Sequence, residues 1–411
     1  MENGELSKPC VRNLKLERED YVVLLGAGAS VEAGLLTSAN LTQAIYNSFN
    51  ERQRLDRFAL LLAYVISKLQ VRNAKRGTSP YAPIEVEELF DALNLLYRRD
   101  SILISEFVER WDSAIDSYYT RFDGSEIRSN FNNILNKTLA RANRRSAFDA
   151  GTADFERLAA SLQPRSFFTN DARHIPDPLQ PFFVSLIKFL QVDQSRLDYL
   201  YPLVRDKRAS LIATLNYDLS IEKACELNGL KYDYGLDRWA QQKRVDWRQR
   251  SDDKRLLKMH GSINWTGSFE DPKIRYDEIK PYEKRIMIFG GVDNKLSADG
   301  PFLQFLYRLE RTILRTNALL VVGYSFRDAH INALINRWRL TRRNSKLAVI
   351  DPSPPPLWQL GFADGPIKRQ VGERETTHTA SVRIIQSPAG EGIQRFINEP
   401  DLFDRPPTVT H

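Results

Sequence analysis

Buried strands are indicated along this chain by short, continuous apolar runs that stop at glycine or at polar residues. The clearest run is Tyr21–Leu25, which is followed directly by a glycine. A run of this kind is typical of a parallel strand that is buried on both faces. Similar runs predict further strands at residues 211–213, 256–259, 285–289, 318–322, 346–350 and 381–385.

Helices are predicted in most of the intervals between these strands. One is expected to follow Asp218 and to end at Asn228-Gly229, where glycine suits a helix C-terminus. Pro301 is placed to begin another helix, and Asp328 to cap a third. Regular alternation of strands and helices predicts an α/β fold, a Rossmann-like, doubly wound and mainly parallel sheet.

The segment between the first two predicted strands departs from this alternation. A helix is expected from about residue 30, and residues 40–70 have helical spacing of apolar positions. A cluster of helix breakers at residues 75–80 indicates a boundary. The sequence therefore predicts a sheet domain of residues 15–75 and 206–390, a large helical insertion of residues 76–205, and a C-terminal tail of residues 391–411 with a short final helix.

Candidate chemistry lies where four of the predicted strands end. The segments concerned are GAGAS from Gly26, TLNYD from Thr214, HGS from His260 and GYSF from Gly323. Ligands of open α/β sheets bind at the carboxyl ends of the strands, so these polar tips predict a nucleotide site. In the first segment, glycine lets the backbone approach a pyrophosphate, and the N-terminus of the expected helix would attract it. A complete GxGxxG is missing, which argues against an ordinary dehydrogenase.

These four segments resemble motifs of the sirtuin (silent information regulator) superfamily, and specifically of its bacterial sirtuin-like antiphage-defence branch. GAGAS is similar to the sirtuin phosphate loop, and TLNYD stands at the place of TQNxD. MHGSINW contains the HG pair of the catalytic-histidine motif, and GYSFRDAHIN is similar to the branch's GxSfxDxxI pattern. The similarity runs from about residue 20 to residue 351 and is interrupted by the helical segment.

The resemblance implies that the site binds NAD and cleaves its nicotinamide–ribose bond. Asn216 would hold the ribose or a water near the anomeric carbon, and His260 would be the base, because imidazole titrates close to neutral pH. Asp218 would orient Asn216 or the ribose, or would only cap the following helix. The residues expected to contact the dinucleotide are Gly26, Ala27, Gly28, Ser30, Thr37, Gly323, Ser325 and Asp351.

Two departures from the deacetylating sirtuins point to water as the acceptor. Those enzymes carry four zinc-binding cysteines, whereas this chain has only two cysteines, and its five histidines show no metal-ligand spacing, so no metal is expected. The sirtuin sequence GIPDFR is replaced by residues 34–40. The resulting hypothesis is an NAD glycohydrolase that releases nicotinamide and ADP-ribose. An NAD or ADP-ribose sensor without turnover, and a protein deacylase or ADP-ribosyltransferase, stay open as alternatives.

Composition and charge restrict the cellular setting. With 42% hydrophobic and 27% charged residues, the chain of 411 residues can bury a large core. A net charge of +7 permits a nucleic-acid partner without demanding one, and the arginine clusters near residues 141–145 and 337–343 are typical of solvated helix faces. The longest apolar run, residues 58–66, is too short for a membrane span. With few cysteines and no signal peptide, the expected location is cytoplasmic.

The resemblance also implies a role and partners. The role is antiphage defence by depletion of NAD, and the expected partners are further copies of the chain in a homo-oligomer and a HerA-type ATPase or another defence protein. Because no P-loop pattern GxxxxGK is present, such an ATPase would be a separate polypeptide.

Overall fold

The structure of the chain is a computed structural model, and it divides into two compact units. One unit comprises Met1–Thr37 and Leu190–His411, and the other comprises Ser38–Phe189. The residues that the structure describes are 20–50, 57–79, 81–99, 178–247, 252–268, 270–274, 285–290, 300–342, 344–356, 361–362, 365–371 and 374–399.

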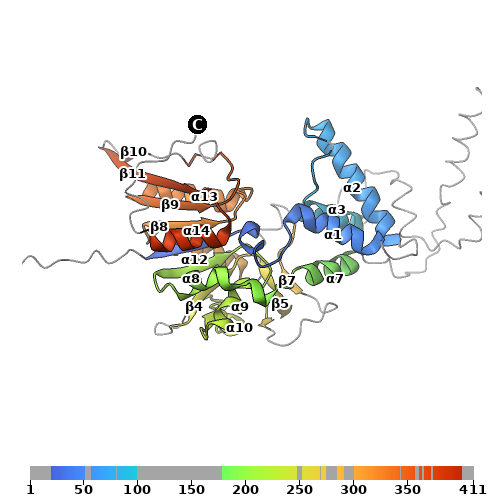
Figure 1. Cartoon of the computed structure of the whole chain (residues 1–411), viewed down its shortest axis with the longest axis horizontal. Coiled ribbons are helices and arrows are strands. Elements are labelled where there is room, and N and C mark those ends of the chain that lie inside the picture. The colour runs from blue at the N-terminus through green and yellow to red at the C-terminus, as the bar shows by residue number, and fades with distance from the viewer. Residues whose placement is uncertain are drawn as a thin grey trace, which may run out of the picture. The chain divides into compact units, whose positions relative to one another are not determined.

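The helical unit is held together by helix α1 (Ser38–Asn50), which packs against each of the other three described helices of the unit. These are α2 (Arg57–Lys75), α3 (Val86–Tyr97) and α7 (Leu179–Phe189) (Figure 1). The apolar residues of α3 are buried as their spacing predicts, and Phe90 lies 5.7 Å from the ring of Phe182 on α7. Because α1 and α2 bury their apolar faces here, residues 38–75 lie with the helices and not with the sheet, unlike the predicted division.

Among the described residues, the main sheet of the sheet unit has eight strands in the order β10-β11-β9-β8-β1-β2-β4-β3. All neighbours run parallel except β10 and β11, which run antiparallel. The predicted doubly wound, mainly parallel sheet is therefore confirmed. The strands are β1 (Tyr21–Leu25), β2 (Ala209–Thr214), β3 (Tyr232–Asp233), β4 (Lys254–Lys258), β8 (Ala318–Val322), β9 (Ser345–Ile350), β10 (Gly365–Val371) and β11 (Arg374–Ile385).

Helices pack with one another beside this sheet in two groups. In the first group, α8 (Tyr201–Arg205) contacts α9 (Ser220–Leu227) and α14 (Ala389–Asn398); in the second, α12 (Phe302–Ile313) contacts α13 (Ala329–Thr341). Helix α14 buries Ile393, so residues 391–398, which were expected in the tail, belong to this layer. The chain runs from β1 through β2 to β4 and then returns to β8 on the other side of β1. The order reverses between β1 and β8, which is the switch point where such sheets bind ligands.

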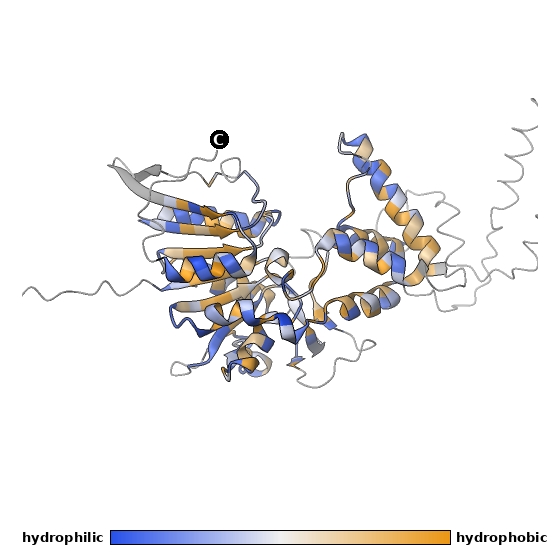
Figure 2. Cartoon of the chain, in the orientation of Figure 1, coloured by the Kyte–Doolittle hydropathy of each residue, from blue (hydrophilic) through white to orange (hydrophobic). Residues whose placement is uncertain are grey.

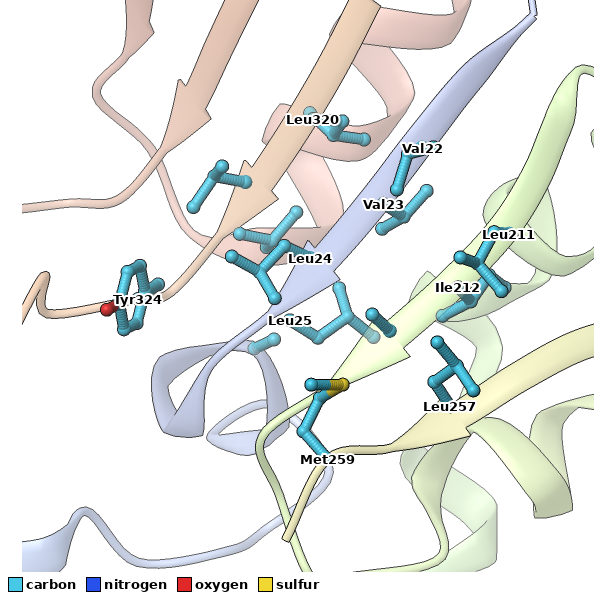
Figure 3. Close-up of a cluster of buried hydrophobic side chains, with 14 of the residues drawn as sticks. Val22, Val23, Leu24, Leu25, Leu211, Ile212, Leu257, Met259, Leu320 and Tyr324 are labelled. Carbon is cyan, nitrogen blue, oxygen red and sulfur yellow. The ribbon is translucent and has the colours of Figure 1, made fainter. Parts of the chain in front are cut away.

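Strand β1 lies at the centre of the core. All five of its residues are at most 2% exposed, as its unbroken apolar run predicts. Figure 3 shows Val22, Leu24 and their neighbours between side chains of β2 and β8, and Figure 2 shows these strands as apolar ribbons. Full burial of one aliphatic side chain contributes about 1.5–3 kcal/mol.

A second, antiparallel sheet continues directly from β4. It consists of β6 (Pro272–Ile274), β5 (Gly261–Gly267) and β7 (Arg285–Met287). The strand predicted at residues 285–289 therefore belongs to this small sheet and not to the parallel one. The reason is a sharp turn after His260: Gly261 has φ +85°, and a Cβ there would lie 2.1 Å from the carbonyl oxygen of Ile286. In the described part of the chain, no helix combines the length and the apolar character that a bilayer crossing requires.

Candidate functional site

The glycine-rich loop after β1 touches the loop after β8 through backbone atoms. The N–H of Gly28 donates to the carbonyl oxygen of Gly323 at 2.9 Å. A Cβ on Gly26 would lie 2.5 Å from that same oxygen, and a Cβ on Gly323 would lie 2.2 Å from the nitrogen of Ala29. Gly323 also has φ +59°. The glycines are therefore required by the close approach of two strand ends.

The helix expected from about residue 30 is wrong. Residues Ala27–Ser30 form only a 3-10 turn, labelled η1, the chain then turns through Gly34 at φ +87°, and α1 begins at Ser38. Within η1, the N–H of Ala29 donates to the carbonyl oxygen of Gly26. Within residues 20–37, no helix longer than this turn follows the glycine loop. Ala27 is exposed and Gly28 half-buried, so the tip of the loop still offers backbone to a ligand.

Asn216 joins the end of β2 to the glycine loop. Its side-chain Nδ2 donates to the carbonyl oxygen of Gly26 at 2.8 Å and to Oγ of Ser30 at 3.0 Å. Its backbone N–H donates to Oγ1 of Thr214 at 3.1 Å. The residue is 9% exposed. These bonds hold the amide in one orientation at the switch point, next to the predicted phosphate loop.

Asp218 combines a capping bond with a position beside Asn216. Its Oδ1 accepts from the N–H of Ser220, the first residue of α9, at 2.9 Å. Asp218, Asn216 and Ser30 all line a cavity of about 10 Å³, which has room for about one water molecule. The carboxylate thus stabilises the start of α9 while it borders the same space as the amide.

His260 is anchored beside the same loop. Its Nδ1 lies 3.2 Å from the carbonyl oxygen of Leu215, the residue before Asn216. A carbonyl only accepts, so the proton of a neutral ring lies on Nδ1, and Nε2 keeps its lone pair. Nε2 lies 3.7 Å from Oδ2 of Asp328, and the His260 ring is buried. The tautomer suits a base that takes a proton at Nε2.

Asp328 was expected only as a helix cap, and that prediction is confirmed. Its Oδ1 accepts from the N–H groups of His330 and Ile331 at the start of α13. The second oxygen faces His260, a role that sequence reasoning missed. The available signal was its place in GYSFRDAHIN, three residues after Ser325.

The other predicted contact residues follow neighbouring strands. Gly323 and Ser325 come directly after β8, and Ser325 is exposed. Asp351 comes directly after β9, and its Oδ1 accepts from the N–H of Ser353 at 2.8 Å. Thr37 is an exposed residue at the end of the loop that follows the glycines. Gly323, Ser325 and Asp351 therefore lie at the carboxyl ends of β8 and β9. The hydrogen bonds described above join Gly26, Gly28, Ser30, Asn216 and Gly323.

Two buried charged residues near the site were also missed. Lys258 on β4 and Glu222 on α9 form an ion pair with Nζ 3.2 Å from Oε1, and their side chains are 1% and 2% exposed. Burial raises the pKa of Glu222, and the positive charge of Lys258 acts against that rise. Among the described residues, no group of three or more His, Cys, Asp or Glu side chains is arranged to hold a metal ion.

A comparison with protein families finds a match within the sheet unit. Residues 210–369 match the family model of the SIR2-like domain. The match contains Asn216, Asp218, His260 and Ser325 but begins after the glycine loop. No curated protein matches the chain.

Three of the solved structures that match the chain are of Sir2 proteins. A Sir2 homologue in complex with NAD is 12% identical with a TM-score of 0.40, covering 92% of this chain and 88% of that one. A mutant Sir2 homologue in complex with ADP-ribose is 11% identical with a TM-score of 0.36, covering 92% and 91%. Sir2Tm bound to a propionylated peptide is 10% identical with a TM-score of 0.36, covering 93% and 93%. The family match at residues 210–369 supports the sirtuin superfamily.

Proposed function

We propose that this chain hydrolyses NAD to nicotinamide and ADP-ribose. The observation that carries the proposal is the double hydrogen bond from Asn216 to Gly26 and Ser30, beside a buried His260 anchored at Leu215. These bonds join the loops that follow β1, β2 and β4, next to the switch point between β1 and β8. The SIR2-like match and the resemblance of the four motifs to sirtuins favour NAD as the dinucleotide.

The residues of the site suit cleavage of a glycosidic bond. When the nicotinamide–ribose bond breaks, its electron pair goes to the ring nitrogen, nicotinamide leaves as a neutral molecule, and positive charge develops on the ribose. A water then forms the new bond to the anomeric carbon and loses a proton to Nε2 of His260, which passes it to solvent. Asp328, 3.7 Å from Nε2, stabilises the imidazolium that forms. Asn216 orients the ribose or the water.

Water is the proposed acceptor because the chain differs from deacylating sirtuins where those enzymes bind acyl-lysine. Residues 34–40 replace the GIPDFR pattern, and α1 begins within them at Ser38. We further propose that the activity depletes NAD in the bacterial cytoplasm during defence against phage. Assembly into a homo-oligomer and control by a separate HerA-type ATPase belong to the same proposal, which rests on the likeness of the motifs to that branch.

The test is incubation of the full chain with NAD, alone and with candidate partner proteins, followed by chromatography of nicotinamide and ADP-ribose. Asn216→Ala and His260→Ala are each expected to lower turnover by about 10²-fold or more. Asn228→Ala is a matched control, since the side-chain amide of Asn228 donates to the carbonyl oxygen of Ala224 in α9. Unchanged turnover in a folded His260→Ala protein would refute the assignment, and tight NAD binding without nicotinamide release would identify a sensor.

A further inference from the structure

A buried pair of opposite charges lies directly under the loop that carries Asn216. Nζ of Lys258 is 3.2 Å from Oε1 of Glu222, and neither side chain is more than 2% exposed. Removing two charges from water costs several kcal/mol per ion, which an ion pair alone rarely repays. A pair in this position therefore requires an explanation beyond stability.

Lys258 makes a second contact that supplies this explanation. Its Nζ donates to the main-chain carbonyl oxygen of Asp218. In the ladder between β2 and β4, Lys258 pairs with Thr214, the last residue of β2. Its side chain thus extends from the end of one strand to the loop that leaves the next. A hydrogen bond from a charged donor is about twice as strong as a neutral one. The loop is held from beneath by an ammonium group and at its tip by the bonds of Asn216.

Glu222 occupies the remaining side of the ammonium group. Its Oε1 accepts from the hydroxyl of Tyr234 at 2.9 Å, while Oε2 is buried without a hydrogen-bond partner among the described atoms. Glu222 and Lys258 both line the cavity of about 10 Å³ that Ser30 and Asn216 also line. A single water there can bridge buried polar groups that lack partners. The ion pair is therefore continuous with the candidate site through one small polar space.

We propose that Lys258 is a positioning residue, which holds the loop from Asn216 to Asp218 in the geometry that NAD cleavage requires. Glu222 is the counter-ion that permits an ammonium group at this depth. The inference rests on the proposed function, since it assigns a role in the same site. It differs from a purely structural role because it predicts an effect on one loop and on turnover in a protein whose overall stability is preserved.

The decisive variant replaces both charges in the full chain, as Lys258→Met with Glu222→Gln. Removal of one partner of a buried pair is strongly destabilising, whereas replacement of both is often neutral, so the double variant is expected to fold. Hydrogen exchange at residues 214–220 is expected to accelerate about tenfold or more, because the charged hydrogen bond to Asp218 is lost. Nicotinamide release is expected to fall roughly 10- to 100-fold in kcat with little change in KM.

Two comparisons make the result specific. Glu222→Gln alone keeps the donor to Asp218 but leaves the ammonium group of Lys258 without its counter-ion, so exchange is expected to rise over the whole sheet unit and not at residues 214–220 in particular. Tyr21→Phe removes a partly buried hydrogen bond to Asp206 at the amino end of β1, and it is expected to change stability without changing turnover.

Wild-type protection and turnover in the folded double variant would overturn the inference. An equal rise in hydrogen exchange over the whole sheet unit of the double variant would also overturn the inference, because the ion pair of Lys258 and Glu222 would then act only on stability. If the unmodified chain releases no nicotinamide under any condition, the proposed function fails. Hydrogen exchange at residues 214–220 of the double variant then tests by itself whether Lys258 positions the loop.

Discussion

Replacement of Gly323 by alanine tests whether contact between two strand ends builds the site. Gly323 has φ +59°, and a Cβ there would lie 2.2 Å from the nitrogen of Ala29 and 2.3 Å from the carbonyl carbon of Gly28. Both neighbours are backbone atoms, so neither can rotate away. The left-handed conformation costs an alanine about 1–2 kcal/mol. Overpacking adds about 1–3 kcal/mol. The free energy of unfolding of the sheet unit should therefore fall by about 2–5 kcal/mol.

Gly229 is the matched control for this substitution. Its φ is +64°, and a Cβ there would meet nothing within 4 Å. Gly229→Ala therefore carries only the conformational cost, about 1–2 kcal/mol. The difference between the two variants isolates the steric contact of the loops. Gly323→Ala should also lower nicotinamide release, since the same contact sets the position of the glycine loop.

The assay is urea unfolding of each full-length variant, followed by tryptophan fluorescence, because Trp265 and Trp338 are buried in the sheet unit. Equal destabilisation by Gly323→Ala and Gly229→Ala would refute the reasoning. It would mean that the loops separate at little cost and that their contact does not define the site.

Three further substitutions test single contacts. Burial, followed by the charge of Glu222, raises the pKa of the Cys225 thiol to about 12. In a Cys10→Ser background, a thiol reagent at neutral pH should therefore label the chain only after unfolding. Rapid labelling of the folded protein would contradict this prediction. Asp328→Asn keeps a good helix cap, so the free energy of unfolding should change by less than about 0.5 kcal/mol. Nicotinamide release should fall, because the negative charge beside His260 is lost. Unchanged release would exclude a role of Asp328 in stabilising the imidazolium. Burial acts to raise the pKa of Asp206, but hydrogen bonds from Arg208 and Tyr21 outweigh burial and lower the pKa below 3.8. The stability that Asp206 contributes should therefore be present above pH 3.8 and lost as the pH falls below it. Asp206→Asn should remove this part of the acid dependence in urea titrations.

The parallel sheet was predictable because its strands carry their own signal. Strands buried on both faces, such as β1 and β8, are continuous apolar runs, and the run alone predicts them. The prediction of a helix after Ser30 was wrong because the glycine loop is shaped by its contact with Gly323, which lies nearly 300 residues away in sequence. The strand at residues 285–289 was found, but its sheet was not. Its partner depends on the turn at Gly261, which no local pattern reveals.

The candidate site shows the same division. Asn216 and His260 are polar residues at strand ends, so the sequence indicates them, and the structure places them on adjoining loops. Lys258 and Glu222 lie within a strand and a helix, where charged residues usually face water. Only the register of β2 against β4 brings Lys258 under the loop at Asp218. The contact between Lys258 and the loop arises from tertiary structure, so no local sequence pattern predicts it.

The placement of β1 between β2 and β8 has a consequence for synthesis of the chain. The ribosome releases the central strand before both of its partners, which begin only at Ala209 and Ala318. A nascent chain therefore exposes a five-residue apolar strand with both edges unpaired while most of the polypeptide is still being made. Such edges recruit other strands, and pairing over this separation is slow. Both edges of β1 cannot be paired until β8 has left the ribosome. A chaperone that shields residues 21–25 would act during that delay.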